Sequence, residues 1–439
     1  MTITTNPFSI MLASLPPDLF FGRRSLIAAI LESLSAPTPA SFSIYGPRTL
    51  GKTSLLRYLC HTERHHLEMA TTRFIYTDFR NVSSSQIVPA LADAIFVSMR
   101  ESSAPPTFRR EDIRADNTEQ LRADLTRYLN AIAPQNRLVF CIDHFDRAFS
   151  NISAADDSFL RQLTDIHSYV IASEEQLSEL LAKGARVESF FVQVLLPRQI
   201  ELLSLDECKE LADKPSAKAG QKFATAEIDY IAQFMGGNPL LLTLGCEYLF
   251  NLARLNEGYA NLRDSLHKNQ TLQEQVSVAL ESSSTIEQVL RLIDETAGPA
   301  AIAALNKVLS GQQLDHQDAR LAVQKSLMVS DFETGSYRPF SEVYRRHALS
   351  LGAPAQGLNR VVGILDLTRI DRVVLEYLLA HSGQVCSFAE LLSLWGDNNA
   401  TKRGLEAVVH RLRGEFKRKE IQHLSIENVR GEGFKLLVS

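Results

Sequence analysis

The chain has 439 residues, of which 45% are hydrophobic and 22% charged, and its formal net charge is −5 at pH 7. These values are typical of a folded globular protein, and at roughly 100 to 200 residues per domain the length predicts two to four domains. The negative balance argues against general attraction to nucleic acid, so DNA binding would require a local basic patch.

Hydropathy and cysteine usage indicate a cytoplasmic protein. The apolar run at residues 10–13 has no basic leader and ends at two prolines, so we expect neither a signal peptide nor a membrane span. No other run approaches the ~18 apolar residues that a spanning helix needs. The five cysteines are scattered without a C-x-x-C pair, which is typical of a reducing compartment.

Short apolar segments alternate with amphipathic helical patterns from about residue 24 to residue 250. This alternation predicts an α/β domain with a mostly parallel sheet. Strands are expected at residues 41–45, 73–78, 137–143, 168–173 and 190–195. Because ligands bind at the carboxyl ends of such strands, Asp143 and Ser173 should lie near a bound ligand.

A phosphate-binding loop follows the first strand and fits the pattern G-x-x-x-x-G-K-[ST]. Its glycines let backbone N–H groups and the following helix N-terminus face phosphates. Lys52 would reach the β- and γ-phosphates of ATP, and the Thr53 hydroxyl would hold Mg²⁺. The loop residues are Gly46, Pro47, Arg48, Thr49, Leu50, Gly51, Lys52, Thr53 and Ser54.

The third strand ends in Asp143, whose carboxylate would support the metal. The next residue is His144, where many ATPases place a glutamate that polarises the attacking water. Histidine accepts a proton only when neutral, and Asp146 is a nearby carboxylate that could partly substitute. We therefore expect ATP binding with slow hydrolysis, with Lys52, Asp143, His144 and Asp146 as the candidate catalytic residues.

Residues 205–350 are predominantly helical in pattern, with a turn at residues 236–239 and a short hairpin near residues 328–338. The expected organisation is a P-loop ATPase α/β domain (1–204), a helical lid (205–270) and a helical, winged-helix-like domain (271–350). A linker rich in small residues (351–362) would then lead to a compact C-terminal unit.

Four segments together resemble the STAND branch of the AAA+ ATPases, which are signal-transduction ATPases. They are P-D-L-F-F-G-R at residues 17–23, the phosphate loop, C-I-D-H-F-D at residues 141–146 and G-G-N-P-L-L-L at residues 236–242. The resemblance covers roughly residues 6–350 and implies that Phe21, Gly22, Arg23 and Pro239 approach the adenine. It also implies that Ser173 contacts the γ-phosphate.

The chain departs from that family at two positions. His144 stands where glutamate is common, which puts hydrolysis in doubt. Asn238 stands where relatives often have histidine, which puts the sensing of the nucleotide state in doubt. Arg186 and Arg198 flank the fifth expected strand and could act on a neighbouring subunit in a nucleotide-dependent homo-oligomer, although such arginines are more often solvated.

The last part of the chain, residues 363–439, carries a helix-turn-helix pattern with a wing. A turn at residues 383–387 offers Ser387 as a helix N-cap. A helix at about residues 401–418 repeats apolar residues at a spacing of three and four, and two strands surround the glycines at 431 and 433. Residues 401–419 hold seven Lys or Arg residues against two Glu, which supplies the local basic patch.

This pattern resembles the winged-helix effector domains of OmpR/PhoB-type response regulators. In such domains the third helix enters the major groove of double-stranded DNA and the wing reaches toward the minor groove. The resemblance makes the following residues candidate DNA contacts: Lys402, Arg403, His410, Arg411, Arg413 and Arg430.

We interpret the chain as an ATP-binding switch that couples nucleotide state to DNA binding, as in a transcriptional regulator. A separate protein or self-assembly would supply the signal. One alternative is a DNA-remodelling or loading ATPase of the initiator or transposition type. Another is a defence-system assembly scaffold whose winged helix docks protein.

Overall fold

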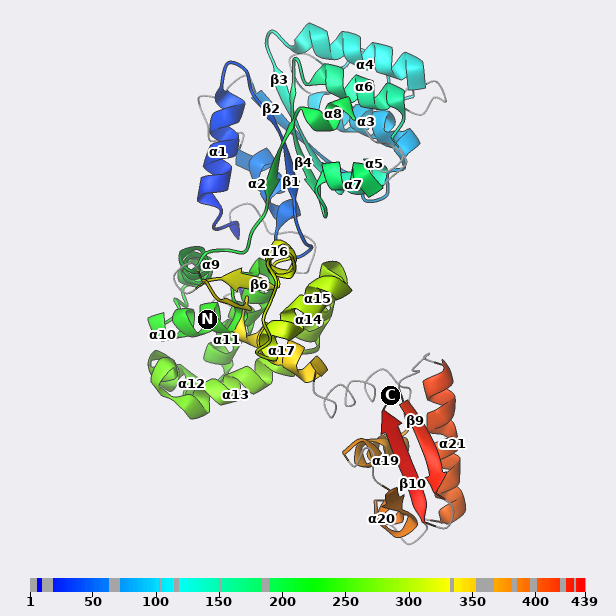
Figure 1. Ribbon diagram of the computed structural model, residues 1–439. Coiled ribbons are helices and arrows are strands. Elements are labelled where there is room, and N and C mark those ends of the chain that lie inside the picture. The colour runs from blue at the N-terminus through cyan, green and yellow to red at the C-terminus, as the bar shows by residue number, and fades with distance from the viewer. Residues whose placement is uncertain are drawn as a thin grey trace. The chain divides into compact units, whose positions relative to one another are not determined.

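The computed structural model describes residues 6–9, 19–62, 72–100, 102, 105–111, 113, 118–149, 152–183, 189–331, 335–352, 367–380, 385–394, 401–418, 424–429 and 432–438. They fall into two compact units, Met1–Tyr344 and Arg345–Ser439 (Figure 1). Among the described helices, none is long and apolar enough to cross a bilayer.

The first unit begins with a five-stranded parallel sheet in the order β2-β3-β4-β1-β5. Its strands are β1 (Ser41–Tyr45), β2 (Thr72–Asp78), β3 (Arg137–Asp143), β4 (Ser168–Ser173) and β5 (Leu195–Gln199). The helices around it are α1 (Arg24–Ser35), α2 (Lys52–Thr62), α3 (Ile87–Met99), α4 (Thr118–Ile132), α5 (Phe145–Phe149), α6 (Ala154–Leu163), α7 (Leu177–Lys183) and α8 (Phe190–Gln193).

Helices cover both faces of the sheet, so the strands are buried on both sides. Helices α1 and α2 lie on one face, and α3, α4 and α6 lie on the other (Figure 1). Successive residues of β3 point into opposite cores: Cys141 packs with the α1 and α2 side, and Phe140 with the α3 and α4 side. The predicted parallel α/β fold is confirmed, and four of its five strands lie where the pattern predicts.

The fifth predicted strand, at residues 190–195, is wrong. Phe190–Gln193 forms α8, because the Ser189 hydroxyl accepts a hydrogen bond from the Val192 N–H and caps the helix. The strand follows it as β5 and, among the described residues, pairs with β1 alone at the edge of the sheet. An edge strand tolerates Pro197, which cannot donate a ladder hydrogen bond.

Helices make up the rest of the first unit, with one short hairpin of β6 and β7, as the pattern predicts. Its elements include α9 (Leu205–Lys218), α10 (Thr225–Met235), α11 (Pro239–Leu255), α12 (Glu257–Leu262), α13 (Gln270–Glu281), α14 (Ser284–Ala297), α15 (Pro299–Leu309), α16 (His316–Gln324), β6 (Met328–Ser330) and β7 (Tyr337–Pro339). The next helix, α17 (Glu342–Gly352), begins in the first unit and continues past its boundary at Tyr344. The predicted domain boundaries inside this unit stay predictions.

In the described residues from 367 onward, three helices pack against a three-stranded antiparallel sheet of order β8-β10-β9. These elements are α19 (Arg369–Ala380), β8 (Val385–Ser387), α20 (Phe388–Ser393), α21 (Lys402–Arg418), β9 (Leu424–Val429) and β10 (Gly433–Val438). The expected turn at residues 383–387 is wrong for 385–387, which form β8, because these residues pair with β10. Ser387 caps α20 as predicted.

Candidate nucleotide site and candidate nucleic-acid interface

The strand order brings the predicted site residues to one edge of the sheet. Strand β4 lies between β3 and β1, so Asp143, Ser173 and the loop after Tyr45 share that edge. A cavity of about 440 Å³ opens there. These predicted residues line it: Phe21, Arg23, Arg48, Thr49, Leu50, Gly51, Lys52, Thr53, Ser54, Asp143, His144, Asp146, Ser173 and Pro239. The other predicted residues, Gly22, Gly46 and Pro47, do not line the cavity, although the carbonyl oxygens of Gly46 and Pro47 bind Lys52.

The phosphate loop turns through three left-handed residues: Gly46 (φ 150°), Thr49 (φ 71°) and Gly51 (φ 85°). Space is tight at the first of them, because a Cβ on Gly46 would lie 2.8 Å from the Ile200 Cγ2 atom. Glycine adopts positive φ without steric cost, whereas Thr49 is strained there. The conformation of this loop is therefore maintained by its surroundings.

Lys52 folds back over the loop. Its Nζ atom donates to the carbonyl oxygens of Gly46 (2.6 Å) and Pro47 (2.8 Å). Burial lowers the pKa of Lys52 to about 8, although the carboxylates of Glu174 and Asp143 act in the opposite direction. An anion beside Lys52 would favour its charged form, which suits a phosphate-binding role.

Asp143 ends β3 with only 1% of its surface exposed. The Tyr76 hydroxyl donates to its Oδ2 atom (3.2 Å), and the His144 N–H donates to its Oδ1 atom (3.0 Å). Together with the Thr53 hydroxyl on the same cavity wall, it offers the oxygen ligands that Mg²⁺ prefers. The residues present thus fit a magnesium ion, which would supply charge neutralisation for phosphates.

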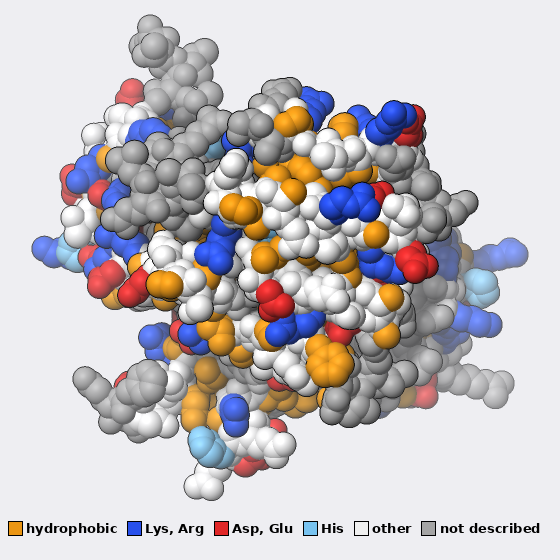
Figure 2. Space-filling model, turned by 90° about the horizontal axis from the view of Figure 1, so that it is seen from above, with side chains coloured by type: hydrophobic (Ala, Val, Ile, Leu, Met, Phe, Trp, Pro, Cys, Tyr) orange, Lys and Arg blue, Asp and Glu red, His pale blue; other side chains and the backbone are white. Residues whose placement is uncertain are grey.

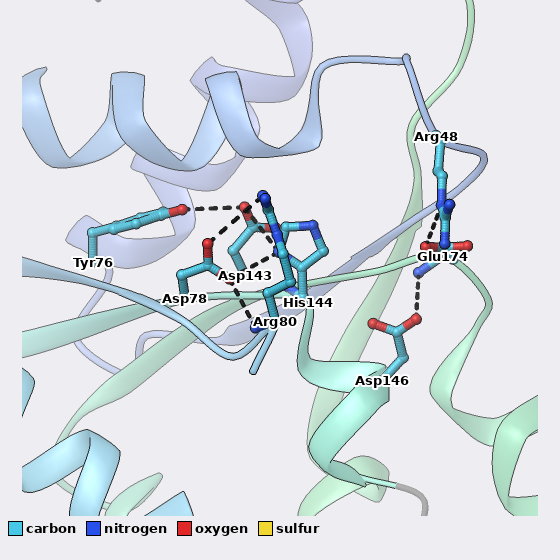
Figure 3. Close-up of polar contacts among 8 residues, drawn as sticks. All are labelled: Arg48, Tyr76, Asp78, Arg80, Asp143, His144, Asp146 and Glu174. Carbon is cyan, nitrogen blue, oxygen red and sulfur yellow. Dashed lines mark hydrogen bonds and ion pairs between the residues drawn. The ribbon is translucent and has the colours of Figure 1, made fainter. Parts of the chain in front are cut away.

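His144 has a left-handed backbone (φ 53°), and Asp78 holds its ring. The imidazole Nδ1 atom lies 3.0 Å from the Asp78 Oδ1 atom (Figure 3). The Arg80 N–H donates to the same carboxylate at 2.8 Å. Sequence reasoning missed Asp78 and Arg80, although a carboxylate at the end of β2 beside β3 was a usable signal.

Asp146 belongs to a second polar group, separate from His144 (Figure 3). Its Oδ2 atom accepts from the Glu174 N–H at 3.4 Å, and Glu174 pairs with Arg48 of the loop at 2.6 Å. Burial raises the pKa of Asp146, opposed by that backbone hydrogen bond. The adjacent Ser173 hydroxyl donates to the Glu175 carbonyl at 2.6 Å.

Arg23 ties the N-terminal box to its surroundings. It is buried with φ 57°, its Nη2 atom donates to the Leu50 carbonyl (2.8 Å), and its N–H donates to Glu207 of α9. Burial lowers the pKa of Arg23 to about 10, with Glu207 opposing the shift. Arg23 thus lines the cavity and also connects the phosphate loop to α9.

Asn238 makes a second connection between the helical part and the loop. Its Oδ1 atom caps α11 by accepting from the N–H groups of Leu240 and Leu241, while its Nδ2 atom donates to the Thr49 Oγ1 atom at 2.8 Å. Pro239 follows at the first turn of α11 and lines the cavity. Asn238 thus contacts the phosphate loop directly.

Sequence reasoning also missed several cavity residues that only packing brings to the site. The apolar ones come from the N-terminal segment, β4, the segment just before α9, α9 itself and α11. Besides Arg80, these residues are Phe8, Phe20, Arg147, Ala172, Glu174, Leu203, Leu211, Leu240, Thr243 and Leu244.

Helix α21 of the C-terminal unit buries one face and exposes basic residues on the other. Leu405, Val408, Val409, Leu412 and Phe416 face the core. Arg403 and His410 are exposed. The Lys402 ammonium lies 4.1 Å from the centre of the Phe388 ring. Arg430 lies outside the described residues.

Two of the predicted DNA contacts hold the unit together. Arg411 forms a bidentate ion pair with Asp371, whose side chain is 3% exposed, at 2.6 and 3.2 Å. Arg413 donates to the Ile426 carbonyl from its Nη2 atom (2.6 Å) and its Nε atom (2.9 Å). Both arginines are therefore already engaged within the fold.

Comparison with protein families identifies two domains. Residues 19–177 match the family of AAA ATPase domains, and residues 363–436 match the C-terminal domain of transcriptional regulatory proteins. The chain thus carries an AAA ATPase domain, which implies nucleotide binding, and a winged-helix domain of the OmpR/PhoB type. The AAA ATPase and OmpR/PhoB-type resemblances are confirmed, and the assignment to the STAND branch stays a prediction.

Solved structures show more distant similarity. A Walker-type ATPase of Pyrococcus abyssi is 13% identical, with 75% of this chain and 96% of that chain covered and a TM-score of 0.48. The ORC2 protein of Aeropyrum pernix, in ADPNP and ADP complexes, is 14% identical over 74% and 91%, with a TM-score of 0.46. The RuvB Holliday junction branch migration motor of Thermotoga maritima is 15% identical over 75% and 96%, with a TM-score of 0.39. These values are too low to transfer a function, and no curated protein matches the chain.

Proposed function

We propose that this protein is a nucleotide-controlled DNA-binding switch of the transcription-regulator type. The single observation that carries the proposal is that one chain joins an AAA ATPase domain to a transcriptional regulatory winged helix. The signal comes from a separate protein or from nucleotide-dependent self-assembly.

Different residues of the cavity bind the phosphates, the metal and the base of Mg·ATP in this proposal. Lys52 and the N–H groups of the phosphate loop bind the phosphates. Thr53 and Asp143 hold the metal. The apolar residues from the N-terminal segment and α11, including Phe21 and Pro239, surround the base.

A route from the cavity to the helical part runs through the end of β4. Ser173 lines the cavity and donates to the Glu175 carbonyl, and the Glu175 carboxylate lies 4.0 Å from the Lys325 ammonium just after α16. Beside it, Gln199 of β5 donates to the Gln324 carbonyl at 2.8 Å. A nucleotide shifts the equilibrium only through different affinity for two states, and these contacts are candidates for what changes.

Hydrolysis in this proposal is slow. The group next to Asp143 is an imidazole bound to Asp78, in the place where many ATPases have a glutamate. A DNA-remodelling or loading ATPase, the main alternative, requires turnover that duplex DNA stimulates. ATP turnover measured with and without duplex therefore separates the two functions.

The main test measures duplex DNA binding without nucleotide, with ADP and with Mg·ATP, for the wild type and Lys52→Ala. We expect nucleotide to change the affinity of the wild type but not that of Lys52→Ala. No nucleotide effect on the wild type would contradict the switch.

DNA contact is tested with Arg403→Ala, because Arg403 is exposed. We expect weaker binding and a shallower dependence of affinity on salt concentration, since phosphate contacts release counterions. Arg411→Ala is a poor probe of contact, because it also leaves the buried Asp371 carboxylate unpaired. If DNA is not bound even at low salt while a protein partner is recovered, the winged helix docks protein instead.

A further inference from the structure

Phe8 lies far from the phosphate loop in sequence but lines the same cavity. Its side chain is 2% exposed and stacks on Phe223, with ring centres 5.6 Å apart and planes 5° from parallel. The Phe250 ring of α11 meets it edge to face at 6.2 Å. Phe8 is thus part of an aromatic cluster that reaches the cavity wall.

Three side-chain hydrogen bonds attach the segment around Phe8 to α11. The Asn6 Nδ2 atom donates to the Glu247 carbonyl and to the Asn251 Oδ1 atom, both at 3.1 Å. The Ser9 hydroxyl donates to the Glu247 carboxylate at 2.8 Å. The position of Phe8 therefore depends on the same helix that supplies Pro239, Leu240 and Leu244 to the cavity.

The two parts of the cavity lining differ in chemistry. The loop and the strand ends supply Lys52, Thr53 and Asp143, which suit phosphates and a metal. The N-terminal segment and the helical part supply rings and aliphatic side chains. A planar aromatic base gains most from stacking against such side chains, so it belongs at the apolar part of the lining.

Resting on the proposed function, we infer that Phe8 contacts the base of the nucleotide and contributes to its binding. Asn6 and Ser9 are positioning residues that hold Phe8 against α11. The ligand class is a nucleoside triphosphate with an aromatic base, and Phe8 contributes to binding of the base but not of the triphosphate.

The experiment compares the affinities of the full-length chain for Mg·ATP and for magnesium with inorganic triphosphate. Phe8→Ala and Phe8→Leu should weaken ATP binding by about tenfold, because the base loses its contact with the Phe8 ring at the cavity wall. Their affinity for triphosphate should stay that of the wild type. The double variant Asn6→Ala/Ser9→Ala, which keeps the Phe8 ring, should weaken ATP binding by a smaller factor and again leave triphosphate binding unchanged.

Phe234→Leu is the matched control, because Phe234 is also buried and stacks on Tyr230 at 5.5 Å in the helical part but does not line the cavity. An ATP affinity of Phe8→Leu equal to that of Phe234→Leu would overturn the inference. So would equal losses for ATP and triphosphate. If Phe8→Ala fails to fold, Phe8→Leu and the double variant decide.

The proposed function fails in a different way. Loss of both ligands in Lys52→Ala is expected whether or not Phe8 contacts the base. A wild type that binds neither ligand would contradict the ATP site itself, while a wild type that binds both with no effect of Phe8 leaves that site intact.

Discussion

Lys52 combines burial with a function that requires charge. Its pKa is lowered to about 8 in the free protein because burial penalises the ammonium, and phosphates bound beside it would raise the pKa again. Binding then takes up a proton in the range between the two pKa values.

The affinity for Mg·ATP should therefore be constant below about pH 8 and fall as the pH rises through that value, because the free protein must regain a proton before it binds. Isothermal calorimetry from about pH 7 to about pH 9.5 measures this. Lys52→Arg is the control, since its side chain stays charged throughout and its profile should be flat. An affinity that rises with pH would contradict the role given to Lys52.

His144 shows how a neighbouring strand can fix one side chain. Its left-handed backbone costs free energy, of the order of 1 to 3 kcal/mol, and the surroundings must offset it. The contact with Asp78 orients the ring, and Asp143 accepts the N–H of the same residue. Strain maintained in this way beside a metal-binding carboxylate is typical of functional sites.

The turn between α10 and α11 connects the cavity to the β6–β7 hairpin. Gly236 has φ 69°, and a Cβ there would meet the Phe340 carbonyl oxygen and lie 2.6 Å from the Ser341 Cβ atom. Two residues later Asn238 contacts the phosphate loop. A shift of this turn would therefore change the packing against Phe340 and Ser341 and also the contact between Asn238 and the phosphate loop.

Gly236→Ala should lower the midpoint of chemical unfolding and weaken ATP binding, because backbone atoms must move to accept the methyl group. Gly220→Ala is the matched control: its φ is 76°, so it pays a similar conformational cost of about 1 to 3 kcal/mol, but nothing lies within 4 Å of its Cβ. Equal effects of the two variants would mean that the contact with Phe340 does not matter.

The basic residues of helix α21 include some that stabilise the unit and some that are candidate DNA contacts. Arg411 and Arg413 bind Asp371 and the Ile426 carbonyl and are still exposed, as are Arg403 and His410, for which the structure gives no such contact among the described residues. Burial pushes the pKa of Asp371 upward, but the hydrogen bonds from Arg411 and Thr368 prevail and lower it. This ion pair stabilises the unit above the ordinary carboxyl pKa and is lost as the pH falls through the lowered value.

In the whole molecule, the charge that would attract DNA is local. The formal net charge is −5, and basic and acidic side chains are interspersed on the face that Figure 2 shows. The excess of basic residues in and beside α21 thus stands out against an acidic chain, and salt should weaken its DNA binding.

Nucleotide and DNA bind to different units in the proposed switch, so their coupling must be reciprocal. If Mg·ATP changes the affinity for duplex DNA by some factor, saturating duplex should change the affinity for Mg·ATP by the same factor. Fluorescence titrations in both directions measure the two factors. Unequal factors at equilibrium would contradict coupling through a shared two-state change.

Contiguous patterns made much of this molecule predictable. The phosphate loop, the strand that ends at Asp143 and the spacing of apolar residues in α21 each depend on neighbours a few positions away, so local sequence specifies them. The run at residues 190–195 misled because a short apolar segment has no period that separates strand from helix.

The remaining features depend on partners far apart in the chain. Asp78 reaches His144 because β2 and β3 are adjacent, Asn238 reaches Thr49 because α11 packs on the loop, and Phe8 reaches the cavity through α11. Spacing along the sequence does not predict these contacts, since they depend on the order of the strands and on helix packing. Local sequence therefore identifies the chemistry of the phosphates and the metal, while packing of the whole unit selects the residues that orient His144, connect the loop to α11 and surround the base.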